Sequence, residues 1–166
     1  MQSLDDLFHA LLEDLYAAEN EQLPMLAALA SKAADETLKR AFRDHEDDTR
    51  EHVARLEDVF EIVGREPRAR GSGAMTAIVA EAMRMVAETT DPAVRDAGMV
   101  AACQAAEHYE IARYGTLTAW AEQLGEDEVV DLLCESLEEE RHAGEFLASI
   151  VEDGIDVGAR PAAVQA

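Results

Sequence analysis

The sequence is short of several residue types, and each shortage narrows the class of protein. Aromatic residues make up only 5% of the 166 residues, and there are four prolines and two cysteines. Few Thr and Tyr argue against a sheet protein, whereas 48% hydrophobic residues, largely Ala, Leu and Val, favour a helical domain. The length suits one domain with a buried core. Cys103 and Cys134 form no CxxC pair, and because both lie within helical patterns we expect reduced thiols in a cytoplasmic protein.

Basic residues are scarce as well. The 14 Lys and Arg stand against 36 Asp and Glu, a net charge of −22, and only Lys32 and Lys39 are lysines. This field repels nucleic acid and anionic membranes and attracts cations, so we expect no nucleic-acid partner. The acidic, lysine-poor surface is either an ordinary solvated surface or an adaptation to high salt. With no run of about 18 apolar residues and no signal peptide at Met1–Asp6, we expect no membrane partner.

Apolar residues recur at helical spacing along most of the chain. The pattern predicts four long helices and, after a loop at 65–73, one short helix in the connection between the second and third long ones. We place these helices at residues 3–31, 35–64, 74–89, 91–124 and 126–152. Two long hairpins joined by such a crossover are typical of an all-α, antiparallel four-helix bundle. We assign residues 1–153 to this domain and 154–166 to a flexible tail.

Each long helix interrupts its apolar stripe with polar or ionisable residues near its middle. The interrupting residues are Glu19 and Gln22, then His45, Thr49 and His52, then Cys103, Glu107, Glu110 and Tyr114, and finally Glu139, Glu140 and His142. The interruptions lie about 15 residues from the nearer turn, which is roughly 22 Å along a helix axis. Packing the two hairpins together therefore brings them into one layer.

A layer of buried carboxylates needs compensation, because each buried ion costs several kcal/mol. Arginine is scarce on these stripes, so bound metal is the simplest compensation. Carboxylate and imidazole ligands suit iron or manganese, and zinc less well. Di-metal bundles take one Glu from each of two helices and a carboxylate-x-x-His pair from each of the others. Glu139-x-x-His142 fits this recipe, whereas Thr49-x-x-His52 has Thr where the carboxylate belongs. Glu110 is a further carboxylate that would take over as a bridge.

The segment AEHYEIARYGTL, at residues 106–117, resembles the signature of the YciE/YciF family of ferritin-like stress-associated proteins. The stretches DLYAAE at 14–19 and AEQLG at 121–125 agree, and the resemblance extends over residues 4–152. It implies a ferritin-like bundle, often dimeric, with a di-metal site and no settled activity. The matching positions carry over Glu19, Glu107, Glu110 and the Glu139–Glu140 pair. The family more often has Gln at position 52 and no His at 142, and both histidines bring this chain closer to rubrerythrin and bacterioferritin.

The candidate set combines the stripe residues with those that the resemblance implies. The candidate metal ligands are Glu19, His52, Glu107, Glu110, Glu139, Glu140 and His142. Glu139 and Glu140 compete, because the spacing to His142 favours the first and the repeat of leucines on the same helix favours the second. We interpret His45 as a hydrogen-bonded core histidine, and we single out no catalytic residue.

Two functions are open at this point. The first is a metal-binding, iron-handling protein of stress or oxidative response, with a di-iron site that acts as a ferroxidase or peroxidase on O2 or H2O2; manganese or zinc are the other candidate metals. The alternative is a non-catalytic structural or interaction protein whose metal site is vestigial or stabilising, which Thr49 favours. For either function we expect a cytoplasmic homodimer.

Overall fold

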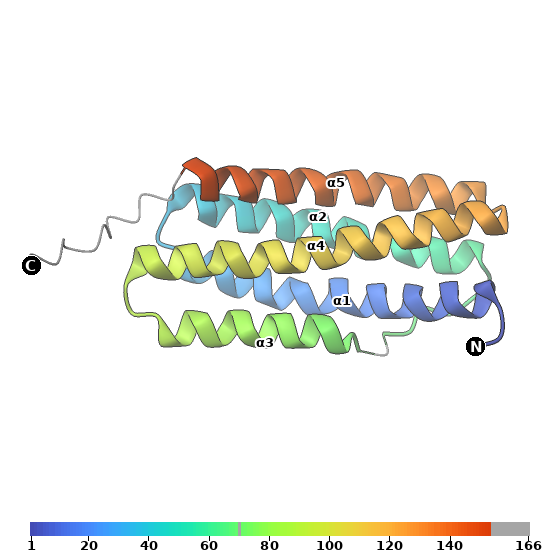
Figure 1. The fold of residues 1–166 in the computed structure, drawn as a ribbon, viewed down its shortest axis with the longest axis horizontal. Coiled ribbons are helices and arrows are strands. Elements are labelled where there is room, and N and C mark those ends of the chain that lie inside the picture. Colours follow the sequence, from blue (N-terminus) through green and yellow to red (C-terminus); the bar gives the residue numbers. More distant parts are fainter. Residues whose placement is uncertain (70, 154–166) are drawn as a thin grey trace, which may run out of the picture.

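The computed structural model describes residues 1–69 and 71–153, with side chains up to residue 150. This part of the chain forms five helices and no strand (Figure 1). The helices are α1 (Leu4–Lys32), α2 (Glu36–Ile62), α3 (Gly73–Glu88), α4 (Pro92–Leu124) and α5 (Asp127–Asp153). The predicted all-α fold is confirmed. The predicted tail at 154–166 lies outside the described residues.

Side-chain caps set the starts of three long helices. Ser3, Asp35 and Asp91 each accept a hydrogen bond from the backbone amide three positions further on, at 2.9 to 3.0 Å. At its other end α4 stops at Gly125, whose φ of 79° lies in the left-handed region that glycine adopts without strain. These local signals explain why the helices begin and end close to the positions predicted from the sequence.

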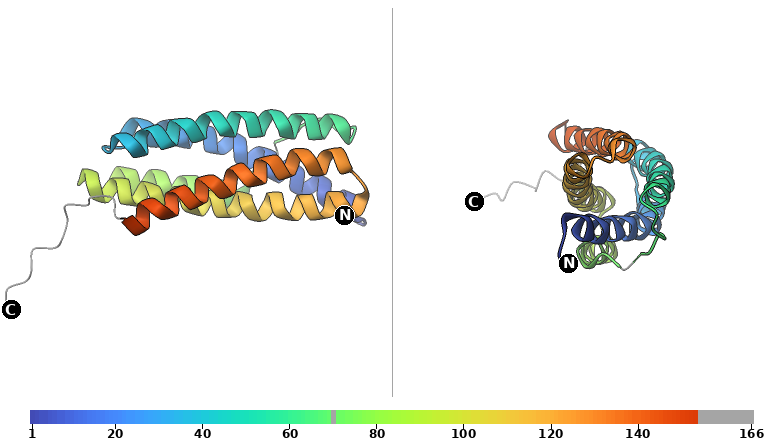
Figure 2. Two further views of the ribbon diagram at one scale, coloured as in Figure 1. Left: turned by 90° about the horizontal axis from the view of Figure 1, so that it is seen from above. Right: turned by 90° about the vertical axis from the view of Figure 1, so that its right-hand side faces the viewer.

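The long helices form two antiparallel hairpins, α1 with α2 and α4 with α5 (Figure 1). Helix α3 carries the chain back between the hairpins, so that α2 and α4 run in the same direction. Seen along the bundle, α3 lies outside the four long helices, against α1 and α4 (Figure 2). This is the predicted four-helix bundle with a short helix in its crossover.

The apolar core of the bundle is divided into two clusters. One surrounds Leu29 and Phe42 and includes Met75 of α3, and the other surrounds Leu12 and Phe60. On α2, α4 and α5 buried polar and charged side chains lie between the two clusters along the sequence, and on α1 Glu19 and Gln22 lie between Ala18 and Met25. The predicted polar layer is therefore present, and apolar packing closes the bundle on either side of it.

Helix α4 also holds the turn between α1 and α2. Asp96 is 1% exposed, and its carboxylate accepts hydrogen bonds from the backbone amides of Ala34, at 3.0 Å, and Asp35, at 2.8 Å. The two hairpins are thus tied together at the end of the bundle where α4 begins.

The described helices do not have the character of membrane spans. None of them is both long and apolar enough to cross a bilayer.

Candidate metal centre

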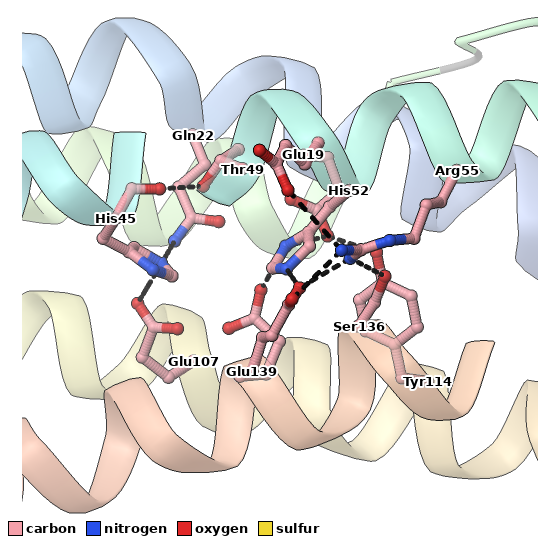
Figure 3. Close-up of polar contacts among 12 residues, drawn as sticks. Glu19, Gln22, His45, Thr49, His52, Arg55, Glu107, Tyr114, Ser136 and Glu139 are labelled. Carbon is pink, nitrogen blue, oxygen red and sulfur yellow. Dashed lines mark hydrogen bonds and ion pairs between the residues drawn. The ribbon is translucent and has the colours of Figure 1, made fainter. Parts of the chain in front are cut away.

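Four carboxylates lie fully buried in the polar layer. Glu19 of α1, Glu107 and Glu110 of α4, and Glu140 of α5 are each 0% exposed. Two buried histidines of α2, His45 and His52, lie among them. Figure 3 shows side chains of this layer pointing toward one another from neighbouring helices. A concentration of acid this deep in a core is unstable unless protons or cations compensate it.

The first group of possible ligands joins three helices. His52 Nδ1 lies 2.9 Å from Glu140 Oε1 and 3.5 Å from Glu19 Oε1. The phenol of Tyr114 donates a hydrogen bond of 2.6 Å to Glu19 Oε1 and holds that carboxylate in place (Figure 3). One ligand atom from each of Glu19, His52 and Glu140 lies within 4.8 Å of the other two, a spacing that suits a single metal ion.

The second group shares Glu140 with the first. His45 Nε2 lies 3.0 Å from Glu107 Oε1, and ligand atoms of His45, Glu107 and Glu140 lie within 4.8 Å of one another. The amide of Gln22 donates to Glu107 Oε1 at 3.3 Å (Figure 3). The thiol of Cys103 donates to the same oxygen at 3.3 Å. The two groups therefore form one centre with Glu140 in the middle.

Several oxygens of this centre are buried without a hydrogen-bond partner among the described residues. They include Glu19 Oε2, Glu107 Oε2, Glu140 Oε2 and both oxygens of Glu110. Buried polar atoms in folded proteins are nearly always satisfied, so such a set calls for a ligand that these side chains do not supply themselves. A metal ion is the ligand that matches oxygen atoms converging with imidazole nitrogens.

Burial shifts the protonation of the whole layer. It raises the pKa of all four carboxyl groups; for Glu140, burial together with the neighbouring Glu107 raises the pKa to about 8. Burial alone would lower the pKa of His52, but its hydrogen bonds to Glu140 and Glu19 outweigh that effect and raise the pKa to about 11. At neutral pH and without metal, these two pKa values favour a protonated Glu140 and a charged His52.

The second ring nitrogen of His52 contacts a carboxylate outside the two groups. His52 Nε2 lies 3.0 Å from Glu139 Oε2, and Arg55 donates to Glu139 Oε1 at 3.0 Å and to Ser136 Oγ at 3.1 Å (Figure 3). Burial alone would raise the pKa of Glu139, but the Arg55 guanidinium outweighs it and holds that pKa below its usual value. An imidazole that offers one nitrogen to a site and the other to a carboxylate is a common arrangement around metal ions, because it fixes the ring.

The structure sorts the sequence-predicted ligands into three classes. Glu19, His52, Glu107 and Glu140 belong to the two groups, and Glu110 is buried in the same layer but belongs to neither. The remaining two candidates also lie outside the groups. Glu139 contacts the Nε2 atom of His52, on the side of the ring away from Glu19 and Glu140, and His142 is exposed. Because Glu139 and His142 are three residues apart, they share one face of α5, and that face turns away from the interior that Glu140 enters.

Several residues of the centre and its surroundings were not among the predicted ligands. His45, interpreted from the sequence as a core histidine, is buried and bonded as expected, but it also completes the second group. Its position seven residues before His52 on the same stripe was the available signal. Gln22 interrupts the stripe of its own helix, which marked it as part of the layer but did not identify Glu107 as its partner. Arg55 has no such signal, because Ser136 and Glu139, to which it donates, lie on α5. Thr49 bonds to the carbonyl oxygen of His45 at 2.8 Å, so its hydroxyl serves its own helix.

Comparison with known proteins places the chain in a family. A family model described as a domain of unknown function, DUF892, matches residues 3–160. The chain belongs to the DUF892 family. Protein YciF of Escherichia coli K12 is 39% identical over 142 residues, which cover 85% of this chain and 86% of YciF. The resemblance read from residues 106–117 is confirmed.

Solved structures of similar proteins share the fold. The crystal structure of the E. coli stress protein YciF matches with a TM-score of 0.88 and 37% identity, covering 92% of this chain and 97% of that one. YcfI from Rhodopseudomonas palustris, provisionally described as a structural protein, also gives 0.88, with 38% identity over 90% and 95% of the two chains. A protein from Xanthomonas campestris gives 0.72, with 25% identity over 91% and 93%.

Proposed function

We propose that this DUF892 protein binds two metal ions, with iron as the first candidate, and that it acts in stress or oxidative response. The observation that carries the proposal is the pair of buried Glu–His–Glu groups that share Glu140. Manganese and zinc are the alternative metals, because the same oxygen and nitrogen ligands accept them. That YciF is called a stress protein supports the physiological setting.

The ligand set fits two divalent ions by charge as well as by atom type. Glu19, His52 and Glu140 would hold one ion, and His45, Glu107 and Glu140 the other. With Glu110 the layer contains four buried carboxylates, and two divalent ions would balance their four negative charges. Metal would then replace the protons that the raised pKa values keep in the layer.

A di-iron centre supplies electrons to O2 or H2O2, the chemistry of a ferroxidase or peroxidase. The protein positions and shields such a centre. Tyr114 fixes Glu19, while Gln22 and Cys103 fix Glu107. Glu110, whose two oxygens meet no hydrogen-bond criterion with a described side chain, is able to hold a proton beside the centre. The apolar clusters on either side keep bulk water out.

A non-catalytic structural role is the second candidate, and Thr49 supports it. The known recipe places a carboxylate at this position of the second helix, but Thr49 bonds to its own backbone and offers no ligand. In that case the metal would stabilise the bundle without turnover. The provisional description of YcfI as a structural protein agrees with this reading.

The two candidates are separated by metal analysis and oxidation kinetics. Protein purified without added metal is analysed by mass spectrometry, and Fe(II) oxidation by O2 and by H2O2 is followed in the same samples. We expect two ions per chain, loss of both in Glu140→Gln, and retention in Glu145→Gln, an exposed glutamate on the same helix. Bound metal without turnover favours the structural role. Protein that stays metal-free after incubation with Fe(II), Mn(II) or Zn(II) contradicts both the catalytic and the stabilising metal site.

Assembly is a separate part of the proposal. We propose a homodimer, as the family resemblance implies, and no nucleic-acid partner, because the net charge of −22 opposes contact with phosphates. Size-exclusion chromatography with light scattering tests the first statement, and a monomer of 18.1 kDa would contradict it.

A further inference from the structure

A groove with a volume of about 530 Å³ opens between α2 and α5 beside the candidate metal centre. Phe42 and Leu147 contribute apolar surface to it, and carboxylates from both helices line it as well. The lining combines residues of one apolar cluster with charged residues outside it. The groove reaches the polar layer from the side of the bundle.

The inner wall of the groove is one side chain thick. Three of its lining residues each contact a member of the metal groups: His45 and Cys103 contact Glu107, at 3.0 and 3.3 Å, and Glu139 contacts His52 at 3.0 Å. His45 is 7% exposed, and its Nδ1 has no hydrogen-bond partner among the described residues. A buried imidazole with one ring nitrogen on Glu107 and the other unpaired thus lies between the groove and the buried carboxylates.

The outer part of the groove is acidic. Asp44 and Asp48 of α2 and Glu138 of α5 are exposed and form no ion pair with another described residue. Glu135 and Glu139, which also line the groove, are paired with Arg55. Arg40 and His142 complete the ionisable lining, so that carboxylates outnumber cations. Such a rim concentrates cations from solution and disfavours anions.

We infer that this groove is the passage by which divalent cations enter and leave the buried centre, with His45 at its inner end. The inference rests on the proposed metal binding. The unpaired rim carboxylates attract a hydrated cation and exchange some of its waters for carboxylate oxygens. His45 then accepts it at the boundary of the layer, one contact from Glu107. The apolar clusters obstruct the routes along the bundle axis on either side.

The test measures loading rates of the full, metal-free chain with Co(II), whose visible absorption changes on binding. One variant carries Asp44→Asn, Asp48→Asn and Glu138→Gln at the rim. Its control carries Asp58→Asn, Glu61→Gln and Glu145→Gln, three exposed acids outside the groove that change the net charge equally. We expect loading of the rim variant to slow about tenfold, with an unchanged affinity and number of ions, and the control to stay within about twofold of the parent.

A second pair of variants tests the passage by its shape. Ala143→Trp, with Ala41→Trp as a replacement if the first does not fold, places a bulky ring in the groove. Ala54→Trp places it on an exposed part of α2 outside the groove. We expect the plug to slow both loading and chelator-driven release without changing the equilibrium affinity, and Ala54→Trp to change neither rate.

The outcomes separate the two proposals. If the parent protein binds no Co(II) at equilibrium, the metal site and the passage are both wrong. If it binds Co(II) and the plug and rim variants load at the parental rate, only the passage is wrong. Equal slowing of the rim variant and its charge-matched control also overturns the passage, because the overall field would then set the rate.

Discussion

The two ring nitrogens of His52 face different partners, and this fixes the orientation of its imidazole. Nδ1 faces Glu19 and Glu140 in the buried layer, whereas Nε2 faces Glu139, which Arg55 holds in turn. Glu139 was predicted as a ligand, but in the structure it contacts the ligand candidate rather than the interior. Its contribution to metal binding would therefore act through the position and basicity of His52.

Removal of the Glu139 carboxylate provides a direct test of this role. We expect Glu139→Ala to weaken metal affinity by about 10- to 100-fold, because His52 loses its orienting acceptor. Glu139→Gln keeps an acceptor oxygen and should fall between the parent and the alanine variant. Competition titration with a coloured chelator measures the affinity, and Glu145→Gln serves as the exposed control. An unchanged affinity in Glu139→Ala would show that His52 needs no such support.

The buried carboxyl groups make the stability of the metal-free chain depend on pH. The pKa of Glu140 rises from 4.5 to about 8 on folding, and that of His52 rises from 6.5 to about 11. Both groups bind more protons in the folded state, so their contribution is complete below their unfolded pKa values and is lost as pH rises through the folded ones. Glu139, whose pKa is lowered, acts in the opposite direction, but only below its ordinary value of 4.5.

We therefore expect the chelator-treated protein to be more stable at pH 5 than at pH 8, as measured by the midpoint of thermal unfolding. Glu140→Gln should flatten this dependence, because the amide does not titrate. The affinity for metal should show the opposite trend and increase as pH rises, because the ligands must lose their protons to bind metal. A metal-free midpoint that rises between pH 5 and pH 8 would contradict the protonated layer.

At the level of helices, Asp96 links α4 to the turn between α1 and α2. Its carboxylate accepts the amides of Ala34 and Asp35, and Asp35 itself caps α2. We expect Asp96→Ala to lower the free energy of unfolding by about 2–4 kcal/mol, because two backbone donors lose a charged acceptor. Urea unfolding measures the change. The exposed Asp58→Ala should shift it by less than about 0.5 kcal/mol, and an equal loss in both variants would contradict the link.

Local signals in the sequence were sufficient for the helices but not for every contact of the site. Ser3, Asp35, Asp91 and Gly125 act on their own helix ends, so they could be recognised without knowing the fold. The side of α5 that enters the core could not be recognised in this way. Neighbouring residues point about 100° apart on a helix, and the packing of α5 against α2 decides which of Glu139 and Glu140 is buried.

Contacts between distant segments were the hardest to predict. The ion pair of His45 and Glu107 joins residues on two hairpins, and the bond of Arg55 to Glu139 joins residues that are 84 positions apart. Counting residues from the turns indicated a shared layer, but it did not give pairs within that layer. The two-group arrangement around Glu140 therefore came from the structure alone.

For the molecule as a whole, the net charge of −22 opposes compact folding through repulsion between acids. Raising KCl from about 0.1 M to 1 M shortens the screening length from about 10 Å to 3 Å. We expect the thermal midpoint to rise, by roughly 2–4 °C for each kcal/mol of repulsion relieved. A nonionic osmolyte at equal osmolality is the control. A thermal midpoint that does not change with KCl would indicate that the acidic surface is an ordinary solvated surface.

Because a polar layer separates the two apolar clusters, the metal-free chain contains two hydrophobic units within one bundle. Protonated carboxyls and imidazole bonds connect the units poorly, so we expect hydrogen exchange to show each end opening with its own free energy. Bound metal would join α1, α2, α4 and α5 across that layer and bring the two free energies together. The ions would thereby determine whether the bundle unfolds as two cooperative units or as one.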